Sequence, residues 1–249
     1  IWKEVNFEYL RNQKLKLCRR ISGGGTVYQD KGNLCFAFIS KFSENKVNNY
    51  KFFNQPLITA LQKAGINVEM DPRNNILFQG KKFSGNAQFT NRKNIISHGT
   101  ILFNTDLKTL RAGLKRNDFK IESRAISSVR SSVMNINEVT DKFSSTQVLK
   151  NYLSTELNVN AAYAFNKTEW NTIQQLAKEK FCSFEWVYGR SPATKITREE
   201  IEIVIEGGKI ASINNEASFL LEGVAYEYTA IKKALRNFPN ASKIVKRIF

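Results

Sequence analysis

The sequence predicts an α+β protein, in which helices pack against a β-sheet. Runs of residues with strand-like patterns alternate with segments whose apolar residues recur at helical spacing. The chain has 249 residues, of which 42% are hydrophobic and 12% aromatic, so it can form a packed core. This length fits one large domain, or a large domain with a small one attached.

Strand patterns dominate the first part of the chain. Strands are expected at Lys16–Cys18, Leu34–Ile39, Ile66–Met70, Ile76–Phe78 and Phe83–Phe89, with another opening at His98. A short helix is expected before the first of them, and a longer one at Val47–Ala64, where Pro56 marks a kink or a helix start. Gln79–Lys82 separates two strand-like runs and predicts a hairpin. Because Leu34–Ile39 is mostly apolar, we expect it to be a buried strand.

Helical patterns dominate the chain from Leu107 to about Lys195, after which a strand hairpin and one more helix are expected. Helices are expected at Leu107–Leu114, Ser145–Leu157, Lys167–Phe181 and Tyr228–Phe238. Asp106 predicts an N-cap for the first of these helices. After Lys195, Ile201–Ile210 predicts a hairpin that turns at Gly207 and Gly208.

The net charge and the motifs that the sequence lacks limit the kinds of molecule that the protein is expected to bind. The formal net charge of +16 favours polyanions or acidic proteins. Nucleic acid is not expected as the partner, because the chain lacks a long basic block, zinc-finger spacing and an aromatic RNA-binding motif. No apolar run approaches the ~20 residues of a membrane span, and no signal peptide is expected. Cys18, Cys35 and Cys182 lack metal-site spacing, so we expect reduced core thiols in a cytoplasmic protein and no metal site.

A run of three glycines, Gly23–Gly25, begins three residues after the pair Arg19 and Arg20. Glycine lets the backbone approach a ligand closely, and successive N–H groups in such a turn suit anions. An arginine fork matches phosphate or carboxylate geometry. Asp30 and Asn33 can bond to a sugar or base, or to their own turn. Neither the P-loop nor the dinucleotide pattern matches, so the run predicts a different anion site or a plain loop between strands.

Three motifs resemble those of the lipoate–protein ligases, which share a fold with biotin–protein ligases. The stretch Arg19–Asn33, RRISGGGTVYQDKGN, resembles the family signature. Gly80–Ala87 matches the family's Lys-x-Ser-Gly-x-Ala element, and His98–Thr100 matches a third. Ile126–Val133 resembles a later Ser-Val-Arg-Ser stretch. The three principal motifs follow one another in the family's order.

The resemblance implies an architecture as well as a class. The sheet should be mixed, with helices packed against it. A catalytic domain is expected over residues 1–194, followed by a small accessory domain over residues 195–249. The resemblance also implies a strand and a Gly-Arg-x-Gln-Asn turn upstream of Ile1, which would complete the acyl pocket.

The implied activity is ATP-dependent lipoate ligation. Lipoate would be activated to lipoyl-AMP with ATP and Mg²⁺. The lipoyl group would then pass to a lysine of a lipoyl domain in a 2-oxoacid dehydrogenase complex or of the glycine-cleavage H protein. Lys82 is the implied catalytic residue. The implied substrate- and nucleotide-binding residues are Arg20, Ser22, Gly23, Gly24, Gly25, Thr26, Val27, Tyr28, Asn33 and Gly85.

Two departures from the family pattern leave alternatives open. Gln29 stands where the family commonly has His, and Asn75 stands where it often has Asp. A protein that accepts preformed lipoyl-AMP is one alternative. Two further alternatives do not depend on these departures: a lipoyl or octanoyl transferase on the same fold that uses a cysteine thioester, and a nucleic-acid-binding module.

Overall fold

The computed structural model describes residues 1–114, 119–125 and 131–249. The predicted Ser-Val-Arg-Ser stretch falls mainly on residues 126–130, which lie outside these ranges. Packing divides the chain into two compact units, each built from separated segments. Unit 1 comprises Ile1–Arg19, Ala112–Ser127 and Phe165–Phe249, and unit 2 comprises Arg20–Arg111 and Ser128–Ala164. The functional boundary expected after residue 194 stays a prediction.

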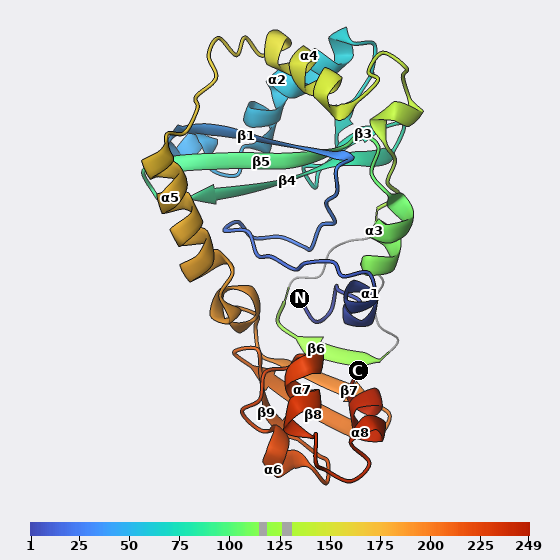
Figure 1. The fold of residues 1–249 in the computed structure, drawn as a ribbon. Coiled ribbons are helices and arrows are strands. Elements are labelled where there is room, and N and C mark those ends of the chain that lie inside the picture. The colour runs from blue at the N-terminus through green and yellow to red at the C-terminus, as the bar shows by residue number, and fades with distance from the viewer. Residues whose placement is uncertain (115–118, 126–130) are drawn as a thin grey trace. The chain divides into compact units, whose positions relative to one another are not determined.

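A five-stranded sheet with the order β1-β5-β4-β3-β2 forms the centre of unit 2 (Figure 1). Its strands are β1 (Asn33–Lys41), β2 (Glu69–Met70), β3 (Ile76–Phe78), β4 (Lys81–Thr90) and β5 (Asn94–Leu102). Every neighbouring pair is antiparallel. The predicted α+β class is confirmed. Within the described residues, the parallel pairing expected of a mixed sheet is limited to a bridge between Lys82 and Val133.

Helices α2 (Tyr50–Lys63) and α4 (Thr146–Glu156) cover one face of this sheet (Figure 1). Helix α4 begins where the sequence indicates, whereas α2 begins at Tyr50, three residues after the predicted Val47. An Asn or Ser side chain before each helix accepts a backbone N–H of its first turn. Pro56 lies inside α2. The core beneath the helices includes Leu57, Leu61, Leu149, Ile101 and Phe83, each at most 1% exposed. Shorter elements complete unit 2: η1 (Glu44–Lys46), α3 (Leu107–Gly113) and η2 (Ile136–Glu138).

Strand β1 differs from the expectation of a buried strand. Cys35, Ala37 and Ile39 are exposed on one face, and Ile39 is 69% exposed. Leu34, Phe36 and Phe38, on the other face, pack against the core. The prediction is wrong because β1 is at the sheet edge and the helices cover only one face. The expectation of buried core thiols is also wrong, since all three cysteines are exposed.

Three other boundaries differ from the sequence prediction. Residues 16–18 are irregular where a strand was expected, and the strand expected at Ile66–Met70 is reduced to β2. His98 lies in the middle of β5 instead of opening it. Short alternating runs give a weak signal for pairing, so tertiary packing decides them.

Unit 1 is organised around a smaller antiparallel sheet with the order β6-β7-β8-β9. Its strands are β6 (Lys120–Ser123), β7 (Thr194–Arg198), β8 (Ile201–Glu206) and β9 (Lys209–Ile213). The predicted hairpin at Gly207 and Gly208 is confirmed, and both glycines have positive φ. The helices of this unit are α1 (Phe7–Asn12), α5 (Lys167–Leu176), η3 (Ala177–Phe181), η4 (Glu185–Gly189), α6 (Ser218–Leu221), α7 (Tyr228–Ala234) and α8 (Ala241–Ile248).

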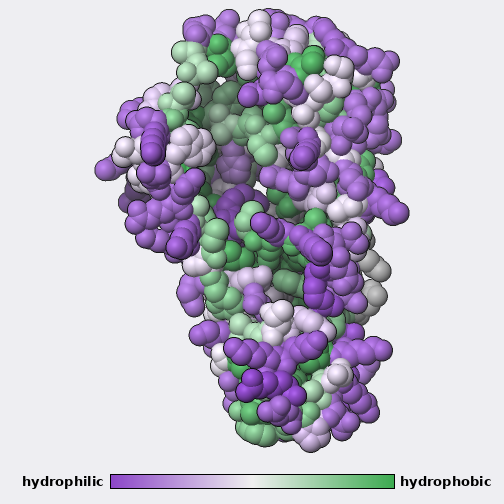
Figure 2. All heavy atoms as spheres, in the orientation of Figure 1, coloured by the Kyte–Doolittle hydropathy of each residue, from purple (hydrophilic) through white to green (hydrophobic). Residues whose placement is uncertain are grey.

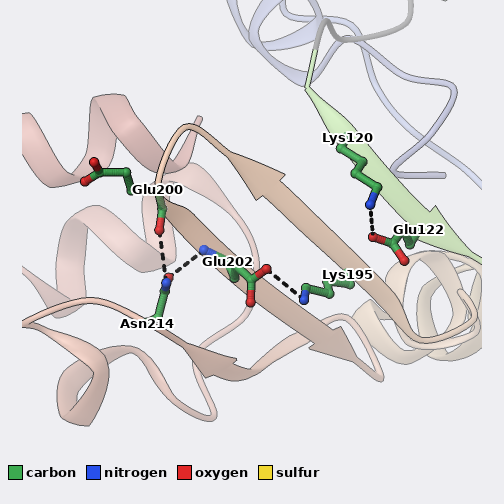
Figure 3. A network of polar contacts seen from close by, with 6 residues as sticks. All are labelled: Lys120, Glu122, Lys195, Glu200, Glu202 and Asn214. Atoms are coloured by element: carbon green, nitrogen blue, oxygen red, sulfur yellow. Dashed lines mark hydrogen bonds and ion pairs between the residues drawn. The ribbon is translucent and has the colours of Figure 1, made fainter.

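Polar contacts fasten the strand ends of this small sheet (Figure 3). Asn214 closes the end of β8, because its amide accepts the Glu202 N–H and donates to the Glu200 carbonyl. Lys195 pairs with Glu202 at 2.8 Å across β7 and β8. These side chains are 40–49% exposed, so the ion pair contributes little stability. The backbone contacts of Asn214 therefore fix the strand end more firmly than the charges do.

Surface composition agrees with the charge of the chain. Hydrophilic residues predominate on the face shown in Figure 2. Among the residues that the structure describes, no helix is both long enough and apolar enough to cross a membrane.

Candidate active site

Arg20 folds the glycine run around its own guanidinium group. Its Nε donates to Ser22 Oγ at 3.0 Å, and its Nη2 donates to the carbonyl oxygens of Gly23 at 2.6 Å and Gly25 at 3.0 Å. Arginine can serve several acceptors at once because its donors form a rigid fork. The run is therefore an ordered loop with a fixed positive charge at its base.

Gly24 gives this loop its shape. Its φ is +96°, a region that side chains other than glycine rarely adopt. A Cβ built there would lie 2.9 Å from Arg20 Nη2. Gly23 has no atom within 4 Å of such a Cβ. The two neighbouring glycines thus have different roles, and only Gly24 is required by the geometry.

A hydrogen bond joins the loop to the sheet. Ser22 is buried, and its Oγ lies 2.7 Å from His98 Nε2 in β5. Burial lowers the pKa of the His98 imidazole, and the positive charge of Arg20 lowers it further. The imidazole is therefore neutral at neutral pH. The sequence pointed to His98 only as part of a motif, and the structure shows that it contacts Ser22 of the loop.

Lys82 extends over Gly85 on β4. A Cβ on Gly85 would lie 3.0 Å from Lys82 Nζ, so the glycine makes room for the lysine. Burial lowers the pKa of the Lys82 ammonium, and the negative charge of Asp71 opposes that effect. Among the described residues, the ion pairs within 4.0 Å do not include Lys82.

Lys82 and His98 share one face of the sheet. Gly85 and Ala87 are two residues apart on β4, so their side-chain positions point to the same side. Ala87 is paired directly with His98 across β4 and β5. Helices α2 and α4 pack on the opposite face, where Ile101 and its partner Ser84 are buried. The lysine and the glycine loop therefore meet the face of the sheet that these helices leave uncovered.

The end of the loop is braced by its polar residues. Asp30 accepts the N–H of Gly32 on Oδ1 and that of Asp106 on Oδ2, both at 2.8 Å. Asn33 Oδ1 accepts the Asp30 N–H at 2.7 Å, while its Nδ2 is buried without a partner. A Cβ on Gly32 would come within 2.0 Å of the Asn104 carbonyl oxygen, so only glycine fits. Asn33 thus serves its own turn, one of its two expected roles.

The two consecutive arginines have different surroundings. Arg19 belongs to unit 1, where its guanidinium donates to the Val187 carbonyl at 2.9 and 3.1 Å and to Ser191 Oγ at 2.8 Å. The Trp186 indole N–H donates back to the Arg19 carbonyl at 2.7 Å. Arg19 therefore binds the backbone of its own unit in this structure, while Arg20 shapes the loop.

The family model of the lipoyl protein ligase A/B catalytic domain matches residues 1–158. The chain belongs to the lipoyl protein ligase A/B family. Lipoate-protein ligase LplJ of Bacillus subtilis is 34% identical over 258 residues, covering 94% of this chain and 78% of that protein. Two solved structures share the fold of this family member. One is a lipoate-protein ligase A bound with ATP, with a TM-score of 0.62 and 24% identity over 74% of this chain and 76% of that chain. The other comes from an archaeal lipoylation system, a bipartite lipoate protein ligase and its E2 lipoyl domain from Thermoplasma acidophilum. It has a TM-score of 0.61 and 24% identity over 74% of this chain and 75% of that chain.

Every predicted site residue of this lipoyl protein ligase family member lies within the matched region. The structure brings Arg20, Ser22 and the glycine run together and places Lys82 over Gly85. Val27 is 48% exposed. Thr26 and Tyr28 lie beside it on the loop, half-buried.

The departures from the family pattern have different surroundings. Gln29 is exposed. Asn75 is buried, and its side-chain amide donates to Asp71 Oδ2 at 2.8 Å. Asp71 was not singled out from the sequence, and the structure shows it as the hydrogen-bond partner of Asn75. Within the described part of the chain, no three His, Cys, Asp or Glu side chains gather as a metal site.

Proposed function

We infer that this chain is an ATP-dependent lipoate–protein ligase, which activates lipoate to lipoyl-AMP and transfers the lipoyl group to a lysine of a lipoyl domain. The observation that supports this most is the position of Lys82. Its half-buried ammonium group, outside any ion pair in the described residues, shares the uncovered sheet face with the loop held by His98. Such an arrangement suits a reaction between two anions.

The first step joins the lipoate carboxylate to the α-phosphate of ATP and releases pyrophosphate. A carboxylate and a phosphate repel, so the site needs positive charge and oriented donors. Lys82 would lie between the acyl oxygen and the α-phosphate, and the loop from Arg20 to Tyr28 would hold the nucleotide. Mg²⁺ would arrive on the ATP phosphates, since this ion typically keeps waters and binds through substrate phosphates with one or two carboxylates.

In the second step, the lysine amine of a lipoyl domain attacks the mixed anhydride and AMP leaves. AMP is a far better leaving group than hydroxide, which is why the reaction is split into two steps. The amine must be neutral to attack, and the positive site would help to keep it so. The charge of +16 would attract an acidic domain. We propose lipoyl domains of 2-oxoacid dehydrogenase complexes or the glycine-cleavage H protein as acceptors, and a cytoplasmic location.

The decisive experiment combines the protein with lipoate, an apo lipoyl domain and MgATP, and follows lipoylation by mass spectrometry. We expect modification of a single lysine, with AMP and pyrophosphate released in equal amounts. A parallel reaction replaces lipoate and ATP with lipoyl-AMP. Transfer from lipoyl-AMP without any ATP-dependent activation would restrict the function to the second step. Transfer in neither reaction would refute the proposal.

A cysteine-dependent transferase makes a distinct prediction. Cys35 pairs with Thr100, which pairs with Gly85, so its thiol lies on the same uncovered face as Lys82. Although Cys35 is exposed as a residue, partial desolvation raises the pKa of its thiol, which disfavours the nucleophilic thiolate. We expect a variant with all three cysteines replaced by serine to ligate at a rate within about tenfold of the wild type. Removing a catalytic nucleophile would cause a much larger loss of rate. A trapped lipoyl thioester would support the transferase instead.

A further inference from the structure

The hydrogen bonds that shape the glycine loop lead to one nitrogen of the sheet. Arg20 Nη2 donates to the carbonyl oxygens of Gly23 and Gly25, and Arg20 Nε donates to Ser22 Oγ at 3.0 Å. A guanidinium group carries its protons at all ordinary pH values, so Ser22 Oγ must be the acceptor in that contact. The same oxygen lies 2.7 Å from His98 Nε2 on β5. The loop is therefore joined to the sheet through a single serine hydroxyl.

The hydrogen of that hydroxyl fixes the tautomer of His98. If Nε2 carried a proton, Nε2 would donate to Ser22 Oγ, and the hydroxyl hydrogen would need a different acceptor. Ser22 is only 8% exposed, and within the described residues its side chain bonds to Arg20 and His98. A buried donor without an acceptor is costly, so the consistent arrangement has Ser22 donating to an unprotonated Nε2. The proton of the neutral imidazole is then on Nδ1.

Protonation of His98 would disrupt this arrangement. Nε2 would become a second donor to an oxygen that already accepts from Arg20, and the Ser22 hydrogen would lose its acceptor. An imidazolium and a guanidinium would also lie on either side of the same hydroxyl. Burial and the charge of Arg20 accordingly both lower the pKa of His98. The loop is therefore held only while the imidazole is neutral.

The other neighbours of His98 do not offset its positive charge. On β1 and β4, His98 is paired with Ala37 and Ala87, which carry no charge. The titratable groups farther along this sheet face are the thiol of Cys35 on β1 and the ammonium group of Lys82, which extends over β4. In the part of the chain that the structure describes, no carboxylate acts on the His98 pKa. An imidazolium at this position would lack a counter-charge.

We propose that His98 is a positioning residue, whose Nε2 lone pair orients Ser22 and, through it, the Arg20 guanidinium that shapes the glycine loop. Protonation of His98 releases the loop, so nucleotide binding weakens at acid pH. His98 acts through the loop and needs no contact with the nucleotide. The effect on ATP rests on the proposed ligase function, whereas the tautomer of His98 and its coupling to Ser22 do not.

The first test determines the tautomer by NMR. His98 is the only histidine, so in protein without a histidine tag the imidazole ¹⁵N signals belong to it. Above the His98 pKa, we expect a proton on Nδ1 and none on Nε2. Ser22→Ala should raise the His98 pKa, because a hydroxyl that donates to Nε2 stabilises only the neutral imidazole.

Ser97→Ala is the matched control for Ser22→Ala. Ser97 is also buried, but it lies on the opposite face of β5 from its neighbour His98, and its Oγ has no partner among the described residues. This substitution should leave the His98 titration unchanged. A proton on Nε2 of the neutral imidazole, or equal His98 pKa values in the wild type and Ser22→Ala, would overturn the proposal whether or not the protein is a ligase.

The second test measures the KM for ATP across the pH range in lipoate-dependent exchange of pyrophosphate into ATP. In the wild type, the KM should rise about tenfold for each pH unit below the His98 pKa, because only the neutral fraction holds the loop. His98→Gln does not titrate and offers an amide oxygen to Ser22, so it should lack this rise. His98→Phe has no acceptor and should show a raised KM at every pH. An equal acid rise in the wild type and His98→Gln, or a normal KM in His98→Phe, would refute the proposal.

Discussion

The conformation of Gly24 allows a quantitative test of the loop. Gly24→Ala places a Cβ on a residue with φ of +96°, at 2.9 Å from Arg20 Nη2. Holding a residue other than glycine in a left-handed conformation costs about 1–2 kcal/mol. The guanidinium can move away, but it would then release the carbonyl oxygens of Gly23 and Gly25. A cost of one or two kcal/mol reduces the ordered population about 5- to 30-fold.

We therefore expect Gly24→Ala to raise the KM for ATP about 5- to 30-fold in pyrophosphate exchange. The loop is largely exposed and can relax, so we expect the Tm to fall by less than about 4 °C. Gly23→Ala is the matched control, because nothing lies within 4 Å of its Cβ. Equal effects of the two substitutions, or an unchanged KM in Gly24→Ala, would refute the role given to this backbone geometry.

Four further predictions concern single features of the protein. Lys82→Ala should slow adenylate formation by at least about 10²–10³, while Lys81→Ala, on an exposed neighbour, stays within about twofold of wild type. Gly32→Ala should lower the Tm by more than an alanine substitution at any other loop glycine, because the Cβ at position 32 would overlap the Asn104 carbonyl. His98, the only histidine, should titrate below its ordinary pKa of 6.5 in NMR, and stability should fall as pH drops through that value toward the folded pKa, because the unfolded state binds the proton more readily. Raising the salt concentration should increase the KM for an acidic lipoyl domain while the KM for lipoate changes little.

Each of these has an outcome that contradicts it. An active Lys82→Ala would remove the lysine from the chemistry. A normal Tm for Gly32→Ala would mean that the backbone near Asn104 moves easily. If the wild type and His98→Gln lose stability equally between pH 7 and pH 5, the imidazole is not responsible for the acid sensitivity. Parallel salt effects on both KM values would argue against charge-guided docking of the domain.

The sequence predicts the residues within each site motif better than it predicts what surrounds them. Lys82 could be singled out because Gly80–Ala87 resembles a family motif. Without that resemblance, the flanking Gly80, Ser84 and Gly85 indicate only a close approach of the backbone. The exposed face of β1 could not, since an apolar run does not show which faces the rest of the chain will cover. The hydrogen bonds between Asp71 and Asn75 could not be predicted either, because they depend on the path of the backbone in that turn. Likewise, nothing local indicates that Arg20 binds carbonyl oxygens of the loop that it precedes.

The discontinuous construction of unit 1 has a consequence for how the chain folds. Its residues come from Ile1–Arg19, Ala112–Ser127 and Phe165–Phe249, so its first segment leaves the ribosome long before its last. Trp2 belongs to the core completed by Ile203 and Ile244, and β6 pairs with β7 across more than seventy residues. Such long-range contacts are slow to form because long loops must close first. The segment Ile1–Arg19 must therefore wait, with its apolar side chains exposed, until Phe165–Phe249 has been synthesised. A fragment that starts at residue 195 would lack both Trp2 and β6, and should aggregate when it is expressed alone.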